Sequence, residues 1–345
     1  MNNSFGEIIK ISTFGESHGL IIGALIDGFF SNYYINEKYI QKNLNLRKPF
    51  TSLFSTQRKE NDKIKIFTGI FKNKSTGAPI LMLIKNSDKK SSDYDNISFN
   101  FRPGHADYTY FLKYKFRDYR GGGRSSARET ACRVASGCLF KNLLYNKGII
   151  IRSYIKKIGY LKINFKYWNY ILNRFFLNLL FINEVKDVIN NCKNSCNSLS
   201  AEIITVINGI EPSLGDPIYK KINSIISSYL LSINATKSIN FGFNFKNKNS
   251  VQVKDEIRNI GFTSNNNGGI LAGITNGQPL IIKIVFKPTS STSKNIKSIN
   301  EKFKNIVNKT YGRHDPCVGL RAIPVIESML YSILINKIIK KKIYE

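Results

Sequence analysis

The residues best suited to chemistry lie in a glycine-rich stretch at 121–130, which reads GGGRSSARET. Ser126 and Glu129 have the spacing of a capping box, so a helix is expected to begin there. Backbone N–H groups at a helix N-terminus carry partial positive charge and lack intrahelical acceptors. Arg124 and Arg128 add full charges that can grip carboxylate or phosphate. The pattern favours an anion site over the alternative of a plain glycine turn before a structural helix.

All three histidines of the chain lie in motifs dense with glycine and charged residues: GESHG at 15–19, RPGHAD at 102–107 and GRHDPC at 312–317. Histidine exchanges protons near neutral pH, and charged neighbours tune that exchange. We therefore expect acid–base chemistry from at least two of His18, His105 and His314, the alternative being structural roles. A zinc site made from the three is disfavoured, because Arg102 and Arg313 would repel a cation.

Two polar loops supply hydroxyls, amides and adaptable backbone: KPTSS at 287–291 and SNNNGG at 264–269. Such groups hold phosphorylated, heteroaromatic ligands, although either stretch could be only a polar loop. The glycine stretch at 121–130 matches neither GxGxxG nor GxxxxGK[ST]. Dinucleotide-binding and phosphate-loop NTPase functions are therefore disfavoured.

The chain is strongly basic, with a formal net charge of +29. Lysine is scattered, and its abundance together with Asn, Ile, Tyr and Phe is typical of drift toward A- and U-rich codons rather than of a nucleic-acid-binding surface. Arginine is different, because six of the 13 Arg residues lie between 102 and 133. Drift would not produce that concentration, so this segment is where anion chemistry is expected.

The elements that must position these residues mix strands and helices in irregular order. Strands are expected at 203–207 and 280–286, and helices at 126–143, from Asp216-Pro217 to Ile233, and at 324–340. The last of these helices is apolar over most of its circumference, which predicts a buried or interface helix. The order favours an α+β fold over a doubly wound sheet. We expect a single domain over 1–345, with a weakly patterned segment at about 150–200.

The 345 residues, 42% of them hydrophobic, are enough for a sizeable core and exclude wholesale disorder. The five cysteines are odd in number and widely spread, so a disulfide framework is not expected, and the pair Cys192 and Cys196 lacks further zinc ligands. We expect no metal. No membrane span or export signal is visible, so the expected location is the cytoplasm.

Seven motifs in order resemble the chorismate synthase family: GESHG at 15–19, FRPGHADYTY at 101–110, DYRGGGRSSARETA at 118–131, SINATK at 232–237, SNNNGGI at 264–270, KPTSS at 287–291 and GRHDPCVG at 312–319. The resemblance implies a β-α-β sandwich with helices between antiparallel sheets. It implies a homotetrameric, cytoplasmic flavoprotein lyase of the shikimate pathway. That family converts 5-enolpyruvylshikimate 3-phosphate to chorismate and phosphate by anti 1,4-elimination, with reduced FMN (FMNH2) and without net redox change.

The resemblance also assigns roles to residues. His18 resembles the histidine that protonates reduced flavin, His105 the one near the leaving phosphate, and Asp315 the carboxylate that relays a proton, with Ser17 and Ser126 as hydroxyl relays. The implied substrate-binding residues are Arg47, Lys48, Arg102, Ser126, Ala127 and Arg128. The implied FMN-binding residues are Arg124, Ser125, Ser126, Asn234, Ala235, Ala272, Lys287, Pro288, Thr289, Ser290, Ser291 and Arg313. His314 receives no role beyond packing or orienting Asp315.

The chain also departs from the family pattern. Leu46, Phe50 and Leu53 stand where the family usually has Arg, Gly and Arg, and Ala272 replaces a usual Gly. The substrate site therefore lacks one or two guanidinium groups. Lys48 and Arg58 are the candidates to compensate, but Lys48 has no fork geometry. Weakened substrate binding is expected, and Leu53→Arg should strengthen it.

Two other functions are kept as alternatives. A basic nucleic-acid-binding protein would show salt-sensitive binding through a continuous Lys/Arg face, but no nucleic-acid-binding motif is found. A flavin-free lyase or isomerase would use His18 and His105 as acid and base. The sequence shows no additional reductase domain, which favours flavin reduced elsewhere over reduction by the chain itself with NADPH. We expect no nucleic acid and no membrane partner.

Overall fold

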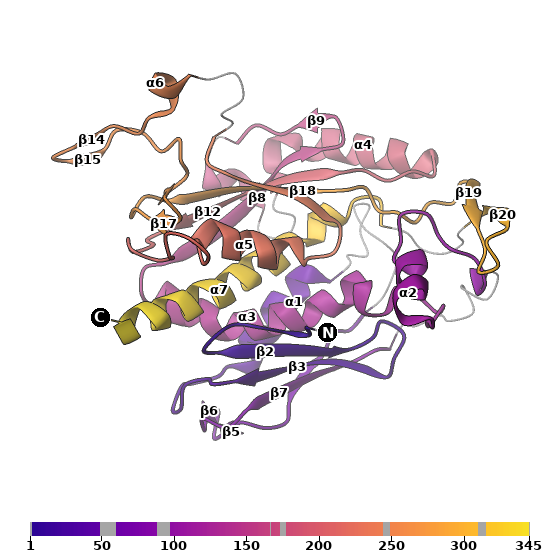
Figure 1. Cartoon of the computed structure of the whole chain (residues 1–345), viewed down its shortest axis with the longest axis horizontal. Helices are drawn as coiled ribbons and strands as arrows, with labels where there is room; N and C mark the ends of the chain where they lie inside the picture. Colours follow the sequence, from indigo (N-terminus) through magenta and orange to yellow (C-terminus); the bar gives the residue numbers. More distant parts are fainter. Residues whose placement is uncertain are drawn as a thin grey trace.

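The computed structural model describes residues 2–48, 60–87, 97–165, 167–172, 177–243, 249–309 and 315–344. Two five-stranded antiparallel sheets enclose a layer of helices (Figure 1). The first sheet has the order β1-β2-β3-β7-β4, with β1 at Ser4–Phe5, β2 at Lys10–Gly15, β3 at Ile21–Asp27, β7 at Ile80–Lys85 and β4 at Ile64–Ile66. The second has the order β13-β18-β12-β8-β9, with β13 at Thr236–Phe241, β18 at Leu280–Phe286, β12 at Ala201–Asn208, β8 at Ile150–Ile158 and β9 at Leu161–Lys162.

The middle layer contains α1 (Glu37–Arg47), α3 (Thr130–Tyr145), α5 (Ile222–Leu231) and α7 (Ile323–Tyr344) (Figure 1). The helix α7 is buried around its circumference from Ile323 to Ile338, because other elements surround it. It crosses α3 closely at Gly137, where an added Cβ would lie 2.4 Å from the backbone oxygen of Ser328. The prediction of a buried helix at 324–340 is therefore confirmed.

The strands predicted at 203–207 and 280–286 are the neighbouring β12 and β18. In both, buried and half-buried residues alternate, with the buried side facing the helices. The segment at 150–200 contains the long strand β8 and the helix α4 (Ile182–Asn194). Val185, Val188, Ile189 and Cys192 form the buried face of α4 at helical spacing.

Of two expected helix starts, the one at Ser126 is confirmed without its capping box, and the one at Asp216-Pro217 is wrong. Ser126 does cap a turn, the 3₁₀ segment Ala127–Glu129, but no capping box forms, because Glu129 turns its carboxylate to Thr13 and Arg133 instead. The helix expected from Asp216-Pro217 begins only at Ile222. Asp216 pairs with Lys340 of α7 rather than capping. The apolar face of this helix is as predicted, with Ile222, Ile226 and Leu230 buried.

Smaller elements extend from the two sheets. The helix α2 (Asp107–Tyr114) and the hairpin β19–β20 (Ile296–Ile299, Asn305–Asn308) lie at one end of the molecule, and α6 (Ser250–Val253) with the hairpin β14–β15 (Ile257–Arg258, Gly261–Phe262) projects at the other (Figure 1). Three further hairpins are β5–β6 (Ile70–Phe71, Lys74–Ser75), β10–β11 (Ile171–Leu172, Leu177–Asn178) and β16–β17 (Ile270–Leu271, Ile274–Thr275). Among the described residues, no helix is long and apolar enough to cross a membrane.

Candidate active site

The glycine stretch brings its backbone against the loop that carries His18. This loop joins β2 to β3, and Asn86, just after β7, holds it by donating to the carbonyls of Glu16 and Gly19 at 2.9 and 3.0 Å. Gly121 has φ +143, and a Cβ added there would lie 2.6 Å from the His18 ring. His18 is buried at 6% exposure. The glycine is therefore required both by its conformation and by the close approach of the imidazole.

The Ser17 hydroxyl lies beside the same glycine. An added Gly121 Cβ would be 3.1 Å from Ser17 Oγ, and this oxygen is buried without a hydrogen-bond partner among the described residues. A buried hydroxyl normally finds a partner. The hydroxyl is thus available to a ligand or water bound between the two loops.

Arg124 is bound to the first sheet in this structure. Its guanidinium donates to the carbonyl and the hydroxyl of Thr13 in β2, at 2.9 and 2.8 Å. It lies 3.9 Å from the Glu129 carboxylate. In this structure Arg124 therefore anchors the glycine stretch to the first sheet.

Arg47 and Arg128 meet at two carboxylates. Arg47, the last residue of α1, donates to Asp62 Oδ2 at 3.0 Å and to the Ala127 carbonyl at 2.8 Å. Arg128 donates to Asn86 Oδ1 at 2.9 Å, to Glu60 Oε2 at 2.9 Å and to Asp62 Oδ1. Burial favours a raised pKa for Asp62, but the positive charges of Arg47 and Arg128 outweigh it, so the pKa is lowered and the carboxylate stays ionised.

Arg102 lies on the other side of the glycine stretch. It forms a two-pronged ion pair with Asp107, with 2.7 Å from Nε to Oδ2 and 2.7 Å from Nη2 to Oδ1, and its Nη2 also donates to the Gly121 carbonyl at 3.3 Å. Asp107 is the first residue of α2, so the helix dipole also favours its negative charge. Arg102 is thereby held with a fixed orientation next to His18 and His105.

His105 joins this region to the loop at 287–291. Its Nε2 lies 2.8 Å from Ser291 Oγ, and both Lys287 and Ser290 donate to the Gly104 carbonyl at 2.8 Å. Burial, reinforced by the charge of Arg102, lowers the pKa of His105 to about 4. The imidazole is therefore neutral at neutral pH when no anion is bound.

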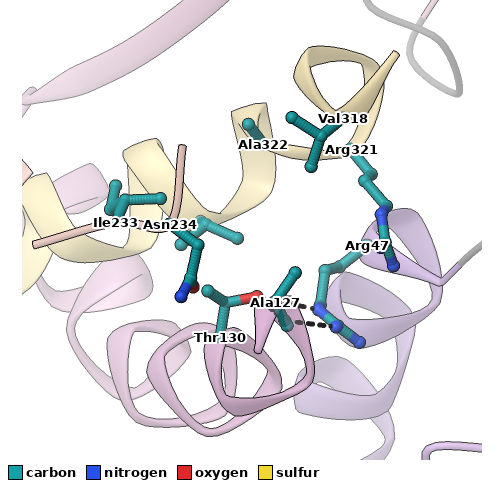
Figure 2. Close-up of a pocket in the computed structure, with 9 residues that line it drawn as sticks. Arg47, Ala127, Thr130, Ile233, Asn234, Val318, Arg321 and Ala322 are labelled. Atoms are coloured by element: carbon teal, nitrogen blue, oxygen red, sulfur yellow. Dashed lines mark hydrogen bonds between the residues drawn. The ribbon is translucent and has the colours of Figure 1, made fainter. Parts of the chain in front are cut away.

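A pocket beside Arg47 contains a second guanidinium, that of Arg321 (Figure 2). Its lining is Arg47, Ala127, Thr130, Ile233, Asn234, Val318, Arg321, Ala322 and Val325. Arg321 donates to the Asp315 carboxylate, which is buried at 8% exposure. Burial lowers the pKa of Arg47, the charges of Asp62 and Glu60 oppose that shift, and the nearby charge of Arg321 adds to it.

Most of the expected site residues share one region of the fold. Contacts run from His18 through Gly121 to Arg102, His105 and Ser291, and through Asn86 to Arg128, Asp62 and Arg47. The pocket beside Arg47 adds Asn234, Ala127 and Asp315 with Arg321. Asn234 also donates to the Ser125 carbonyl, and Lys287 donates its backbone N–H to the carbonyl of Ala235. Residues expected from segments far apart in the sequence are thus brought together.

Ala272 is not brought to this region within the chain. It lies in the turn of β16–β17, which adjoins the start of β18, whereas 287–291 follow the end of that strand. The seven residues of β18 separate the two by about 20 Å. Ala272 has φ +50, which explains why glycine suits the position. Arg313, His314, Phe50, Leu53 and Arg58 lie outside the described residues.

Four residues near the site are not predicted by the sequence motifs: Glu60, Asp62, Asn86 and Arg321. Glu60 and Asp62 carried a usable signal, since acidic residues number 23 in the chain and these two follow a basic stretch closely. Asn86 and Arg321 carried none, because Asn and basic residues are common throughout this sequence. Their positions depend on contacts across the fold.

Comparisons with known proteins agree with this arrangement. A family model described as chorismate synthase matches residues 9–339. A chorismate synthase of Carsonella ruddii (strain PV) is 87% identical over 345 residues and covers 100% of both chains. One of Francisella tularensis subsp. holarctica (strain FTNF002-00 / FTA) is 46% identical over 347 residues, covering 99% of each chain. A solved crystal structure of chorismate synthase superposes with a TM-score of 0.74 at 27% identity, covering 98% of this chain and 93% of that one.

The full-length matches confirm the resemblance inferred from the seven motifs. The structural match and the two antiparallel sheets with helices between them confirm the α+β prediction. The chain therefore belongs to the chorismate synthase family and is a carbon–oxygen lyase of the shikimate pathway, which leads to the aromatic amino acids.

Proposed function

We propose that this enzyme binds 5-enolpyruvylshikimate 3-phosphate against Arg47, Arg102 and Arg128 and releases its phosphate there to form chorismate. The observation that carries the proposal is the single network that joins these guanidinium groups to His18 and His105. The substrate has two carboxylates and one phosphate, so its site must hold several negative charges at close quarters. Fixed guanidinium groups also stabilise the charge that grows on the departing phosphate.

Lys48 and Ala127 complete the proposed substrate site. Lys48 follows Arg47 as the C-cap of α1, and partial burial with the nearby charge of Arg128 lowers its pKa, although Asp62 opposes the shift. A bound anion would reverse that shift by favouring the charged form. The Ala127 carbonyl accepts from Arg47, which aligns the guanidinium with the start of α3.

His105 is proposed to carry a proton at the leaving phosphate. The neutral imidazole is held by Ser291 and lies beside Arg102, whose charge disfavours protonation. A phosphate bound between Arg102 and His105 would cancel that effect and raise the pKa of His105. His105 can then hold a proton at the oxygen of the departing group.

His18, Ser17 and Asp315 are proposed as the remaining proton-carrying groups, with Ser126 as a further hydroxyl. His18 and Ser17 share the space facing Gly121. Asp315 is held in place by Arg321 at the pocket that also contains Arg47. The proposal is supported by the presence of acid–base groups both beside Gly121 and at the pocket that contains Arg47.

The family uses reduced FMN, and we propose that Arg124, Ser125, Ser126, Asn234, Ala235, residues 287–291 and Arg313 hold it here. The described residues fit a phosphorylated, polar-edged ring, because Asn234 Oδ1 and Thr289 Oγ1 are buried polar atoms without partners among them. When bound, the reduced flavin supplies electron density that assists departure of phosphate. Lys287, partly buried and near Lys237, has a lowered pKa that a bound phosphate would restore.

A homotetramer, working in the cytoplasm, is the proposed assembly. Ala272 lies at the far end of β18, so its participation in a flavin site requires a second copy of the chain. The projecting segment nearby exposes apolar side chains that a neighbouring subunit would cover: Val251 at 81%, Ile257 at 69% and Ile260 at 89% exposure. Sedimentation analysis of the wild type and of the double variant Ile257→Asp/Ile260→Asp tests this. If the double variant still forms the tetramer, the projecting segment is not part of the subunit interface.

The reaction is tested by anaerobic turnover with and without reduced FMN. Phosphate release with chorismate formation, dependent on reduced flavin and lost in His105→Gln, is the expected result. Phosphate release without flavin would favour the flavin-free lyase.

A further inference from the structure

Asp62 stands between the two arginines proposed to hold the substrate. Its Oδ2 accepts from Arg47 Nη1 at 3.0 Å, and its Oδ1 accepts from Arg128 Nη1. The Asp62 side chain is 0% exposed, and those of Arg47 and Arg128 are 2% and 5% exposed. One carboxylate therefore fixes the relative orientation of two guanidinium groups that come from different helical segments.

The backbone of Asp62 has an unfavourable conformation that contacts with α1 stabilise. Its φ of +44 lies in the left-handed region, which costs a non-glycine residue about 1 kcal/mol or more. The Gln41 side chain of α1 holds the chain just after Asp62, donating to the Asp62 carbonyl at 3.0 Å and accepting from the Ile64 N–H at 3.0 Å. Arg47 lies further along the same helix, so α1 positions both the carboxylate and one of its partners.

Glu60 touches the same arginines in a different way. Its Oε2 accepts from Arg128 Nη1 at 2.9 Å and lies 3.8 Å from Arg47 Nη1. Its side chain is 8% exposed, against 0% for Asp62. The two carboxylates offset the charges of Arg47 and Arg128, and Lys48 is a further cation near Asp62 and Arg128. An acidic substrate can take the Arg128 N–H group that faces Glu60 only if the Glu60 carboxylate moves away.

We propose that Asp62 is a positioning residue that keeps Arg47 and Arg128 aligned for the substrate, and that Glu60 is the counter-ion that an anionic group of the substrate replaces. The inference rests on the proposed role of Arg47 and Arg128 as substrate ligands. Asp62 acts through the arginines and does not touch the reacting atoms. Glu60 competes with the substrate for Arg128.

Asp62→Asn and Glu60→Gln test the two roles. An amide presents one acceptor and one donor, so in either orientation its NH₂ group faces an N–H of Arg47 or Arg128, and one arginine loses its alignment. For Asp62→Asn we expect substrate affinity, measured by calorimetry on the protein with oxidised FMN, to fall by about tenfold to a hundredfold. Turnover at saturating substrate should fall less than affinity. Glu60→Gln removes the competing charge, so substrate affinity should rise.

Loss of folding is separated from loss of alignment by a second variant. Asp62→Glu keeps the charge but displaces the carboxylate by one methylene, and it should show the same affinity defect. Asp216→Asn removes the carboxylate from an ion pair with Lys340 far from the site, and serves as the control for the same chemical change. The defect of Asp62→Asn should also disappear when Arg128 has already been replaced by Met.

The outcomes separate this inference from the proposed function. Folded Asp62→Asn with substrate affinity within about twofold of wild type would overturn it, as would Glu60→Gln weakening substrate as strongly as Asp62→Asn. Failure of both Asp62 variants to fold would reduce Asp62 to a structural role and overturn it too. If Arg47→Met and Arg128→Met bind substrate as well as wild type, the proposed substrate site itself is wrong, whatever the Asp62 variants show.

Discussion

Replacing Gly121 by alanine should disable the enzyme by moving His18. The added methyl would lie 2.6 Å from Cδ2 and 2.9 Å from Nε2 of His18, and 3.1 Å from Ser17 Oγ. The ring must retreat by about 0.8 Å to reach an ordinary contact of 3.4 Å, and a displacement near 1 Å can cost about a hundredfold in rate. We therefore expect Gly121→Ala to lower turnover about a hundredfold.

The backbone contributes a separate cost, because Gly121 has φ +143. Alanine in that region costs about 1–3 kcal/mol, and crowding of the histidine adds about 1–3 kcal/mol. Gly148 is the matched control, since it has φ +78 but nothing within 4 Å of an added Cβ. Gly148→Ala should lose stability through its backbone alone and keep its turnover.

The assay compares anaerobic turnover with reduced FMN and urea unfolding for wild type, Gly121→Ala and Gly148→Ala. The excess destabilisation of Gly121→Ala over Gly148→Ala, about 1–3 kcal/mol, reflects the contact with His18 and Ser17 together with the difference between φ +143 and φ +78. Equal turnover in the two variants would refute the reasoning, because it would show that the close approach of Gly121 does not position the histidine.

Three further predictions concern buried charges. The NMR signal of His105 can be assigned in a protein with ¹³C-labelled histidine, because it is absent from His105→Gln. Without ligand this signal should titrate near the lowered pKa of about 4, and inorganic phosphate should raise that pKa. A midpoint near 6.5 without ligand would contradict this. Because the folded pKa of His105 is below 6.5, its contribution to stability should fall as pH drops from 6.5 toward 4. Burial raises the pKa of Glu327 to about 7, so its contribution to the free energy of unfolding should fall as pH rises from 4.5 through 7. In urea titrations at several pH values, Glu327→Gln should reduce the dependence of the unfolding free energy on pH. An unchanged dependence would rule this out. Arg321→Met removes the ion pair between Arg321 and buried Asp315, and should lower the free energy of unfolding by about 3–5 kcal/mol and turnover by at least about tenfold. Arg258→Met removes an exposed ion pair and should change neither quantity. Equal effects of the two variants would contradict a role for Arg321.

The prediction of the fold succeeded where local pattern reflects burial. The β-branched runs at 203–207 and 280–286 and the all-round apolar segment at 324–340 predicted two strands and a buried helix correctly, because side-chain periodicity follows the environment of each element. It failed for the capping bond expected from Glu129 and for the helix start expected at Asp216. There the side chains expected to cap a helix bind partners distant in sequence, such as Thr13 and Lys340, and tertiary contacts outweighed the local preference.

The sequence by itself determined the family, the residue types and the approximate elements, because motifs of adjacent residues and their periodicity are local properties. Only the tertiary structure decided which charges meet. It placed Asp62 between Arg47 and Arg128, turned Arg124 toward Thr13, paired Arg321 with Asp315, and put Ala272 at the far end of β18. Each of these depends on distances between segments far apart in the chain, and packing of the helices between the two sheets sets those distances.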